Sequence, residues 1–160
     1  MFLACSASAR IGFTLDECKA QYGNFDREPW IDGRETFASF KTGDVWVELF
    51  DGKVFQIMYT ASRGSGGWSK SEALAILKKN TGPTLFNPWK LQSEGNGDYY
   101  YTGKDEKHMK LSAYLFMFAS YPSERVLNVE IIDEQVSAKF SKYHDERSKR
   151  EQRKEQNAKH

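Results

Sequence analysis

The stretch 43–60, GDVWVELFDGKVFQIMYT, most constrains the fold because it predicts two strands joined at Asp51-Gly52. An Asp-Gly pair between apolar runs is a strong signal for a β-hairpin. The length of the loop decides which side chains share a face of that hairpin. A two-residue loop would pair Leu49 with Val54 and mix polar residues into both faces. We favour a three-residue loop that ends with Gly52 in the left-handed conformation, because it separates the apolar side chains from the others.

With that loop, one face of the hairpin carries Val45, Val47, Leu49, Phe55, Ile57 and Tyr59. The other face carries Trp46, Glu48, Val54, Gln56, Met58 and Thr60. Because the first of these faces is apolar except for one phenolic hydroxyl, we expect other elements of the chain to cover it.

Two capped helices are candidates for that cover. Thr14 with Glu17, and Ser69 with Glu72, match the capping-box pattern, in which an N-cap hydroxyl and a carboxylate three residues later satisfy each other's backbone donors. A strand at 35–40 and the hairpin follow the first helix. The sequence predicts further strands at 98–102, 111–121 and 125–132 after the second helix, and loops around Trp30 and Trp89.

This repeated order predicts an α+β fold made of two tandem units, each a helix and a three-stranded antiparallel sheet (α-β-β-β), with a C-terminal helix. The expected segments are a signal-peptide remnant at 1–9, the first unit at 10–62, a glycine-rich joint at 63–68, the second unit at 69–132 and a charged helix or tail at 133–160. A single α+β domain with accidental symmetry is the alternative.

The motif Arg10-Ile11-Gly12-x-Thr14-x-x-x-Cys18-x-x-x-Tyr22-Gly23, followed by a Phe-Asp-Gly-Lys hairpin, resembles the start of a group of small, uncharacterised exported bacterial proteins. In arrangement, the capped helix and its sheet are similar to the SmpA/OmlA outer-membrane lipoproteins, and two such units in tandem are similar to the β-lactamase-inhibitor protein. This resemblance implies an exported protein-binding module with a concave sheet surface and no catalysis. The inhibitor's disulfides are absent here and its contact residues have no counterpart, so no functional residue is carried over.

The first nine residues, MFLACSASA, also indicate export. Ala7-Ser8-Ala9 fits the small-x-small pattern of a signal-peptidase site, and we favour cleavage after Ala9 into a periplasmic or secreted protein. Lipidation of Cys5 and a plain disordered N-terminus are the alternatives. After cleavage only Cys18 remains, on an apolar helix face where a buried structural thiol is expected rather than a nucleophile.

Charge and hydropathy narrow the class of partner. The net charge is +1, but residues 137–160 hold eight Lys or Arg against four Asp or Glu, so the rest of the chain is acidic. A basic nucleic-acid-binding surface is therefore not predicted. No apolar run approaches the roughly 20 residues needed to cross a bilayer.

No catalytic, metal or cofactor site is predicted, because no nucleophile elbow, phosphate loop or clustered metal ligands occur. Large apolar side chains also lie on the hairpin's second face and on the long strand of the second half: Trp46, Met58, Tyr114, Phe116 and Phe118. We favour cover of this face by the C-terminal helix or the first unit; if the face is open, it is a partner surface for another protein. The alternative function is a small-ligand carrier or enzyme, with a pocket between the repeats lined by Trp89, Tyr99 and Tyr101.

Overall fold

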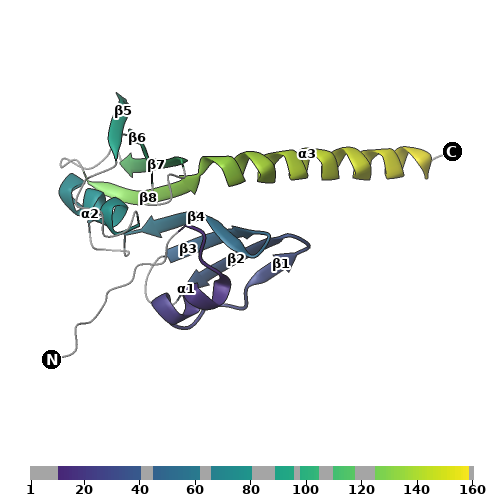
Figure 1. Cartoon of the computed structure of the whole chain (residues 1–160), viewed down its shortest axis with the longest axis horizontal. Helices are drawn as coiled ribbons and strands as arrows, with labels where there is room; N and C mark the ends of the chain where they lie inside the picture. Colours follow the sequence, from purple (N-terminus) through teal and green to yellow (C-terminus); the bar gives the residue numbers. More distant parts are fainter. Residues whose placement is uncertain are drawn as a thin grey trace.

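The chain is described by a computed structural model that covers residues 11–40, 45–61, 66–80, 89–95, 98–104, 110–117 and 125–158. Its elements, in chain order, are α1 (Leu15–Tyr22), β1 (Trp30–Asp32), β2 (Glu35–Phe40), β3 (Val45–Phe50), β4 (Lys53–Thr60), α2 (Lys70–Asn80), β5 (Lys90–Gly95), β6 (Asp98–Lys104), β7 (Lys110–Met117), β8 (Val126–Asp133) and α3 (Glu134–Asn157). The strands form one antiparallel sheet in the order β1-β2-β3-β4-β8-β7-β6-β5 (Figure 1). The predicted α+β class is confirmed.

The two halves of the chain share this sheet, joining where β4 pairs with β8. The sequence predicts a separate three-stranded sheet in each half, and this prediction is wrong in two respects: each half supplies four strands, and the sheet is continuous. The unforeseen strands, β1 and β5, lie at the two edges of the sheet, where the sequence predicts loops. Pairing β4 with β8 removes two bare strand edges from the middle of the molecule, which explains why separate sheets are not favoured.

One side of the sheet, called here the first face, carries the hydrophobic core. Its central row crosses five neighbouring strands through the register partners Val47, Ile57, Ile131, Ala113 and Tyr101. Both short helices pack on this face: Cys18 of α1 and Ala73 and Leu77 of α2 are completely buried in the same cluster. The predicted cover of the apolar hairpin face by capped helices is therefore confirmed.

Both predicted capping boxes are formed. In α1 the Thr14 backbone N–H donates to Glu17 Oε2 over 2.6 Å, and the Glu17 N–H donates to Thr14 Oγ1 over 3.2 Å. In α2 the matching distances between Ser69 and Glu72 are 2.7 and 3.3 Å. Each box satisfies two backbone donors that have no partner inside the helix, which fixes where the helix begins.

The hairpin corrects the predicted loop length. Asp51 and Gly52 form a two-residue loop with φ of 53° and 73°, the left-handed pair typical of a type I′ turn. A bulge at Phe55 then shifts the register, so that Val47 still faces Ile57. As a result Val54 and Phe55 exchange their predicted faces: Val54 lies in the core, and Phe55 contacts α3.

The segment before α1 accounts for this bulge. Gly12 N–H donates to the Val54 carbonyl over 2.7 Å, and Val54 N–H donates to the Phe13 carbonyl over 2.8 Å. The backbone of Val54 is thus satisfied by residues far away in the sequence rather than by β3. Without those partners, an irregular ladder would leave buried backbone groups unpaired, at a cost of roughly 1–3 kcal/mol each.

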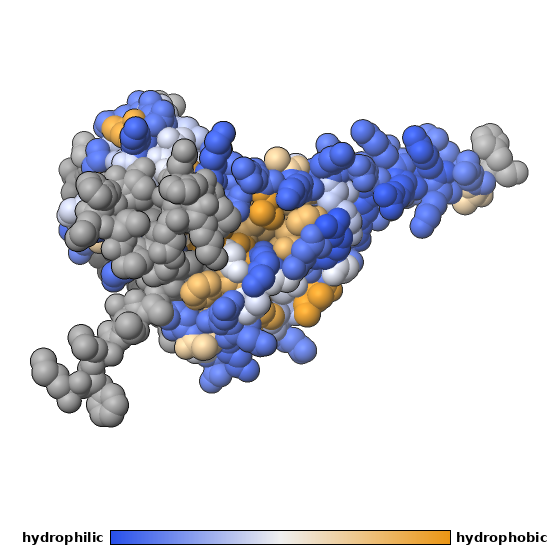
Figure 2. All heavy atoms as spheres, viewed as in Figure 1, coloured by the Kyte–Doolittle hydropathy of each residue, from blue (hydrophilic) through white to orange (hydrophobic). Residues whose placement is uncertain are grey.

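The helix α3 follows its N-cap Asp133, whose carboxylate accepts the backbone N–H groups of Gln135 and Val136. Figure 1 shows α3 extending well beyond the sheet, and Figure 2 shows hydrophilic atoms along its distal part. The sequence predicts either a charged helix or a tail for residues 133–160, and the structure has a helix that runs to Asn157.

Candidate functional site

The second face of the sheet, opposite the core, carries most of the predicted partner surface. A row of register partners crosses it: Ser39, Trp46, Met58, Glu130, Tyr114 and Tyr100. Trp46, Met58, Tyr114 and Phe116 all lie on this face and all are half-buried. The structure thus brings four of the five predicted residues together, and the fifth, Phe118, lies outside the described residues.

The aromatic side chains of this face contact one another in two groups. The Phe37 and Trp46 rings are 5.3 Å apart between centroids, at the β2–β3 end. On the other side of β8, Tyr114 stacks on Tyr100 at 4.8 Å and on Phe116 at 6.1 Å. Aromatic pairs at these separations stabilise each other beyond the area that they bury. The second face is therefore an ordered aromatic surface rather than scattered apolar side chains.

The helix α3 covers one end of the second face. Phe140 packs against Phe55 and Phe50 at centroid distances of 4.8 and 5.7 Å. Further along the helix, His144 Nε2 lies 3.0 Å from Glu35 Oε1, and Arg147 lies 2.7 Å from Asp32 Oδ2. These contacts hold the first turns of α3 across the ends of β4, β3, β2 and β1.

Two carboxyl groups lie on the second face between the aromatic groups. Burial raises the pKa of Glu130, and a hydrogen bond of 2.6 Å from the Gln56 amide partly opposes this shift. Burial also raises the pKa of Glu48, and the negative charges of Glu130 and Glu35 raise it further. Both groups are ionised only at a cost in free energy, so a positive charge brought to this face would stabilise them.

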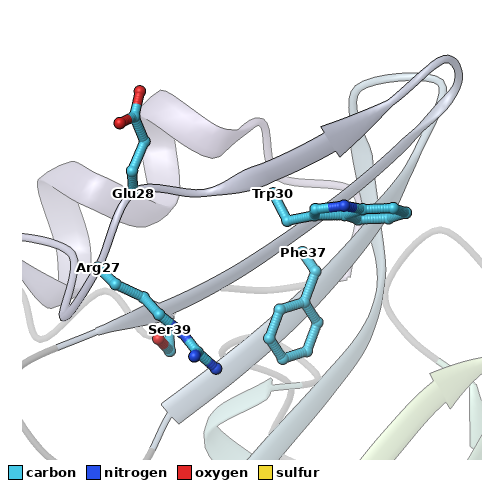
Figure 3. A pocket seen from close by; sticks show the side chains of 5 residues that line it. All are labelled: Arg27, Glu28, Trp30, Phe37 and Ser39. Carbon is cyan, nitrogen blue, oxygen red and sulfur yellow. The ribbon is translucent and has the colours of Figure 1, made fainter.

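A pocket of about 310 Å³ lies where the second face meets the edge strand β1. It is lined by Arg27, Glu28, Trp30, Phe37 and Ser39. Figure 3 shows the Trp30 and Phe37 rings near each other, the Arg27 side chain running past Ser39, and the Glu28 carboxylate pointing away. Trp30 is 53% exposed, which leaves its indole open to solvent at the sheet edge.

Two polar groups of this pocket, Ser39 and Arg27, lack a hydrogen-bond or ion-pair partner among the described residues. Ser39 is 6% exposed, and its buried hydroxyl makes no hydrogen bond within the described part of the chain. The Arg27 guanidinium lies 6.0 Å from the Trp46 ring centroid and pairs with no described carboxylate. The pocket therefore combines aromatic walls with unused hydrogen-bond donors, a combination typical of a binding site.

Sequence reasoning did not find this pocket. Residues 24–33 were predicted to be a loop, so Arg27 and Trp30 were not placed beside β2. Phe37 and Ser39 are two residues apart in β2, so strand alternation alone predicts that they share a face of the sheet. The pairing of Trp30 with Phe37, which closes the pocket, is a contact that no local pattern reveals.

The three residues predicted to line a ligand pocket lie elsewhere. Trp89, Tyr99 and Tyr101 are 5%, 3% and 5% exposed and belong to the core. A Cβ added to Gly103 would approach the Trp89 ring to 2.9 Å, so the indole lies directly on the strand backbone. None of the three lines the pocket beside β1.

The thiol of Cys18 is buried, as predicted. Burial, with a smaller contribution from the Glu17 carboxylate, raises the pKa of Cys18 to about 12. A thiol that keeps its proton at neutral pH is a poor nucleophile. Cys5 and the rest of the predicted signal segment lie outside the described residues.

Three comparisons, with protein-family models, curated proteins and solved structures, found no match. Among the described helices, none combines the length and the apolar character that crossing a membrane requires. Within the same part of the chain, no three His, Cys, Asp or Glu side chains come together as metal ligands.

Proposed function

We propose that this chain is an exported, non-enzymatic module that binds another protein through the second face of its sheet. The observation that carries the proposal is the ordered row of half-buried aromatic and thioether side chains beyond the end that α3 covers. The half-buried carboxyl groups of Glu48 and Glu130 on this face favour a partner that brings cationic side chains. Large aromatic side chains with a few polar groups are typical of the centres of protein interfaces.

Two further parts of the proposal concern origin and location. Each half of the chain places its four strands in chain order from the edge of the sheet to its centre, β1 to β4 from one edge and β5 to β8 from the other. This symmetry supports a tandem duplication. A duplicated unit predicts that residues 69–133 alone associate in pairs through the freed β8 edge; a monomer would contradict it. The sequence of residues 1–9 supports export, which a reporter fused to the full-length chain tests by its compartment.

The alternative function, a small-ligand carrier or enzyme using Trp89, Tyr99 and Tyr101, has less support because these side chains are packed in the core. The described pocket between α1 and α2, of about 170 Å³, is lined by other residues, including Tyr22, Tyr59 and Asn80. We therefore retain protein binding as the proposed function.

Site-specific photocrosslinking tests the interaction. A photoreactive phenylalanine derivative replaces Tyr114 on the second face, and as a control it replaces Ala20, which is exposed on α1. We expect one identified protein to be crosslinked in cells from position 114 and not from position 20. With both proteins purified, Met58→Lys should weaken binding at least tenfold, because its ammonium lies beside Glu130 and occupies the place of the partner's cationic side chain. Equal crosslinking from both positions would contradict the proposal.

A further inference from the structure

We propose that the pocket of Arg27, Trp30, Phe37 and Ser39 binds an aromatic side chain with an adjacent carboxylate, presented by the partner protein. This inference rests on the proposed function, since it specifies what one end of the partner's contact must contain. The pocket lies next to the aromatic row, because Ser39 and Trp46 are register partners and Phe37 packs on Trp46.

The volume and the walls define the apolar part of the ligand. About 310 Å³ is at the small end of ligand pockets and suits one aromatic side chain with a short polar group. Trp30 and Phe37 supply two ring surfaces on neighbouring strands, held by the register pair that they form. A ring placed against them would bury the half of the Trp30 indole that now faces solvent.

The charge of the pocket defines the polar part. Arg27 is the cation among the lining residues, and the carboxylate of Glu28 points away from the pocket (Figure 3). By contrast, Arg34 and Arg147 each pair with an aspartate. A guanidinium binds a carboxylate through two parallel hydrogen bonds. The Ser39 hydroxyl, buried beside the Arg27 side chain, is a further donor that lacks an acceptor among the described residues.

The position at the sheet edge favours a polypeptide over a free small acid. In the described sheet, β1 pairs only with β2, so its outer edge is open to an added strand. An extended segment along β1 would place alternate side chains on the second face, where the pocket lies. Trp30 and Asp32 are the residues of β1 on that face, and Asp32 already pairs with Arg147, so Trp30 marks the position that a ligand can use.

Peptide binding followed by NMR tests the inference on the full-length chain. The indole N–H resonance of Trp30 is assigned through Trp30→Phe and followed during titration. The ligands are N-acetyl-Phe-Asp-amide, its Phe-Asn counterpart, N-acetyl-Asn-Phe with a free C-terminus, and 3-phenylpropionate. We expect the Phe-Asp peptide to bind at least tenfold more tightly than Phe-Asn, and this preference to weaken with added salt. Arg27→Gln should abolish the preference, whereas Arg153→Gln, which removes the same charge from the exposed part of α3, should leave it unchanged.

Each outcome decides between the alternatives. Equal binding of Phe-Asp and Phe-Asn would overturn recognition of the carboxylate. Tighter binding of the free-terminus peptide would identify a C-terminal carboxylate as the source, and binding of 3-phenylpropionate alone would overturn the assignment to a protein. If no peptide binds while crosslinking from position 114 persists, this inference fails and the proposed function stands. If Phe-Asp binds but no second-face partner is crosslinked, the proposed function fails instead.

Discussion

Tyr59 of β4 connects the two halves of the chain on the first face, and replacing it with phenylalanine tests that connection. Its hydroxyl lies 2.6 Å from the hydroxyl of Tyr22 in α1 and donates to Asn80 Oδ1 of α2 over 3.1 Å. The Asn80 amide in turn donates to the Ile76 carbonyl over 2.8 Å. One phenol therefore joins the helix of the first half to the helix of the second.

The structure sets the expected magnitude of Tyr59→Phe. Asn80 is 2% exposed, so its carbonyl oxygen loses a donor that water does not readily replace, at a cost of about 1–3 kcal/mol. Tyr22 is half-buried and borders a pocket of about 170 Å³, where water can take over its hydrogen bond at lower cost. We expect a loss of about 2 kcal/mol in the free energy of unfolding. For a chain of this length, that corresponds to roughly 4–8 °C in Tm.

Urea denaturation measures this change as a lower midpoint with an unchanged m value. The matched control is Tyr143→Phe, because the Tyr143 hydroxyl makes no hydrogen bond with the described residues, and it should change stability by less than about 0.5 kcal/mol. A double-mutant cycle with Asn80→Ala should give a coupling energy of about 1 kcal/mol or more. A Tyr59→Phe midpoint equal to that of the wild type, with no coupling to Asn80, would refute the reasoning.

Three further predictions concern groups on both faces. Burial raises the pKa of Cys18 to about 12 from 9.0, so above pH 9 only the unfolded state loses this proton, and the free energy of unfolding should fall by about 1.4 kcal/mol per pH unit toward pH 12. Cys18→Ala should remove this contribution to the pH dependence, and labelling of the native protein by a thiol reagent would contradict the prediction. Burial and the Glu130 charge raise the pKa of Glu48, so the stability that its proton contributes is present below the unfolded pKa of about 4.5 and is lost as pH rises. Glu48→Gln should therefore raise the denaturation midpoint at pH 7 but not at pH 4, and a lower midpoint at pH 7 would contradict this prediction. Phe140→Ala removes the packing of α3 against Phe55 and Phe50 and should lower the free energy of unfolding by about 2–3 kcal/mol. Deleting residues 149–160 should change the free energy of unfolding by less than about 0.5 kcal/mol. A larger effect of the deletion would show that the distal part of α3 packs on the rest of the protein.

The sequence predicted the elements that local chemistry defines. The capping boxes at Thr14 and Ser69 predicted two helix starts, because each box depends on residues within one helical turn. The strand over 35–40 matches β2 at both ends, since its apolar residues and flanking turns are local as well.

The remainder depends on contacts between residues that are distant in the sequence. The bulge at Phe55 is stabilised by Gly12 and Phe13, and the continuous sheet by pairs such as Tyr59 with Val129. The β5 sequence, KLQSEG, carries no alternation to distinguish an edge strand from a loop. Patterns of period two or 3.6 show which side chains share a face of an element, but not which distant strand lies beside it.

The same distinction applies to the candidate site. Alternation along the strands placed Trp46, Met58, Tyr114 and Phe116 on one face, and the structure brings them together. The prediction that Trp89, Tyr99 and Tyr101 line a pocket treated these aromatic side chains as a surface feature. Aromatic side chains also contribute much of the packing in protein cores, and all three are buried there. Arg27 and Ser39 were missed because only the tertiary fold brings them to the same pocket.

The central claim is that the second face of the sheet is accessible in the free protein and covered by a partner in the complex. Hydroxyl-radical footprinting measures this directly, because methionine and aromatic side chains oxidise readily when solvent reaches them. The account predicts that Met58 and Tyr114 are oxidised in the free chain, while the core residues Trp89 and Tyr99 are protected. Adding the crosslinked partner should then protect Met58 and Tyr114. Protection of both residues in the free chain, or oxidation that the partner does not change, would contradict the claim.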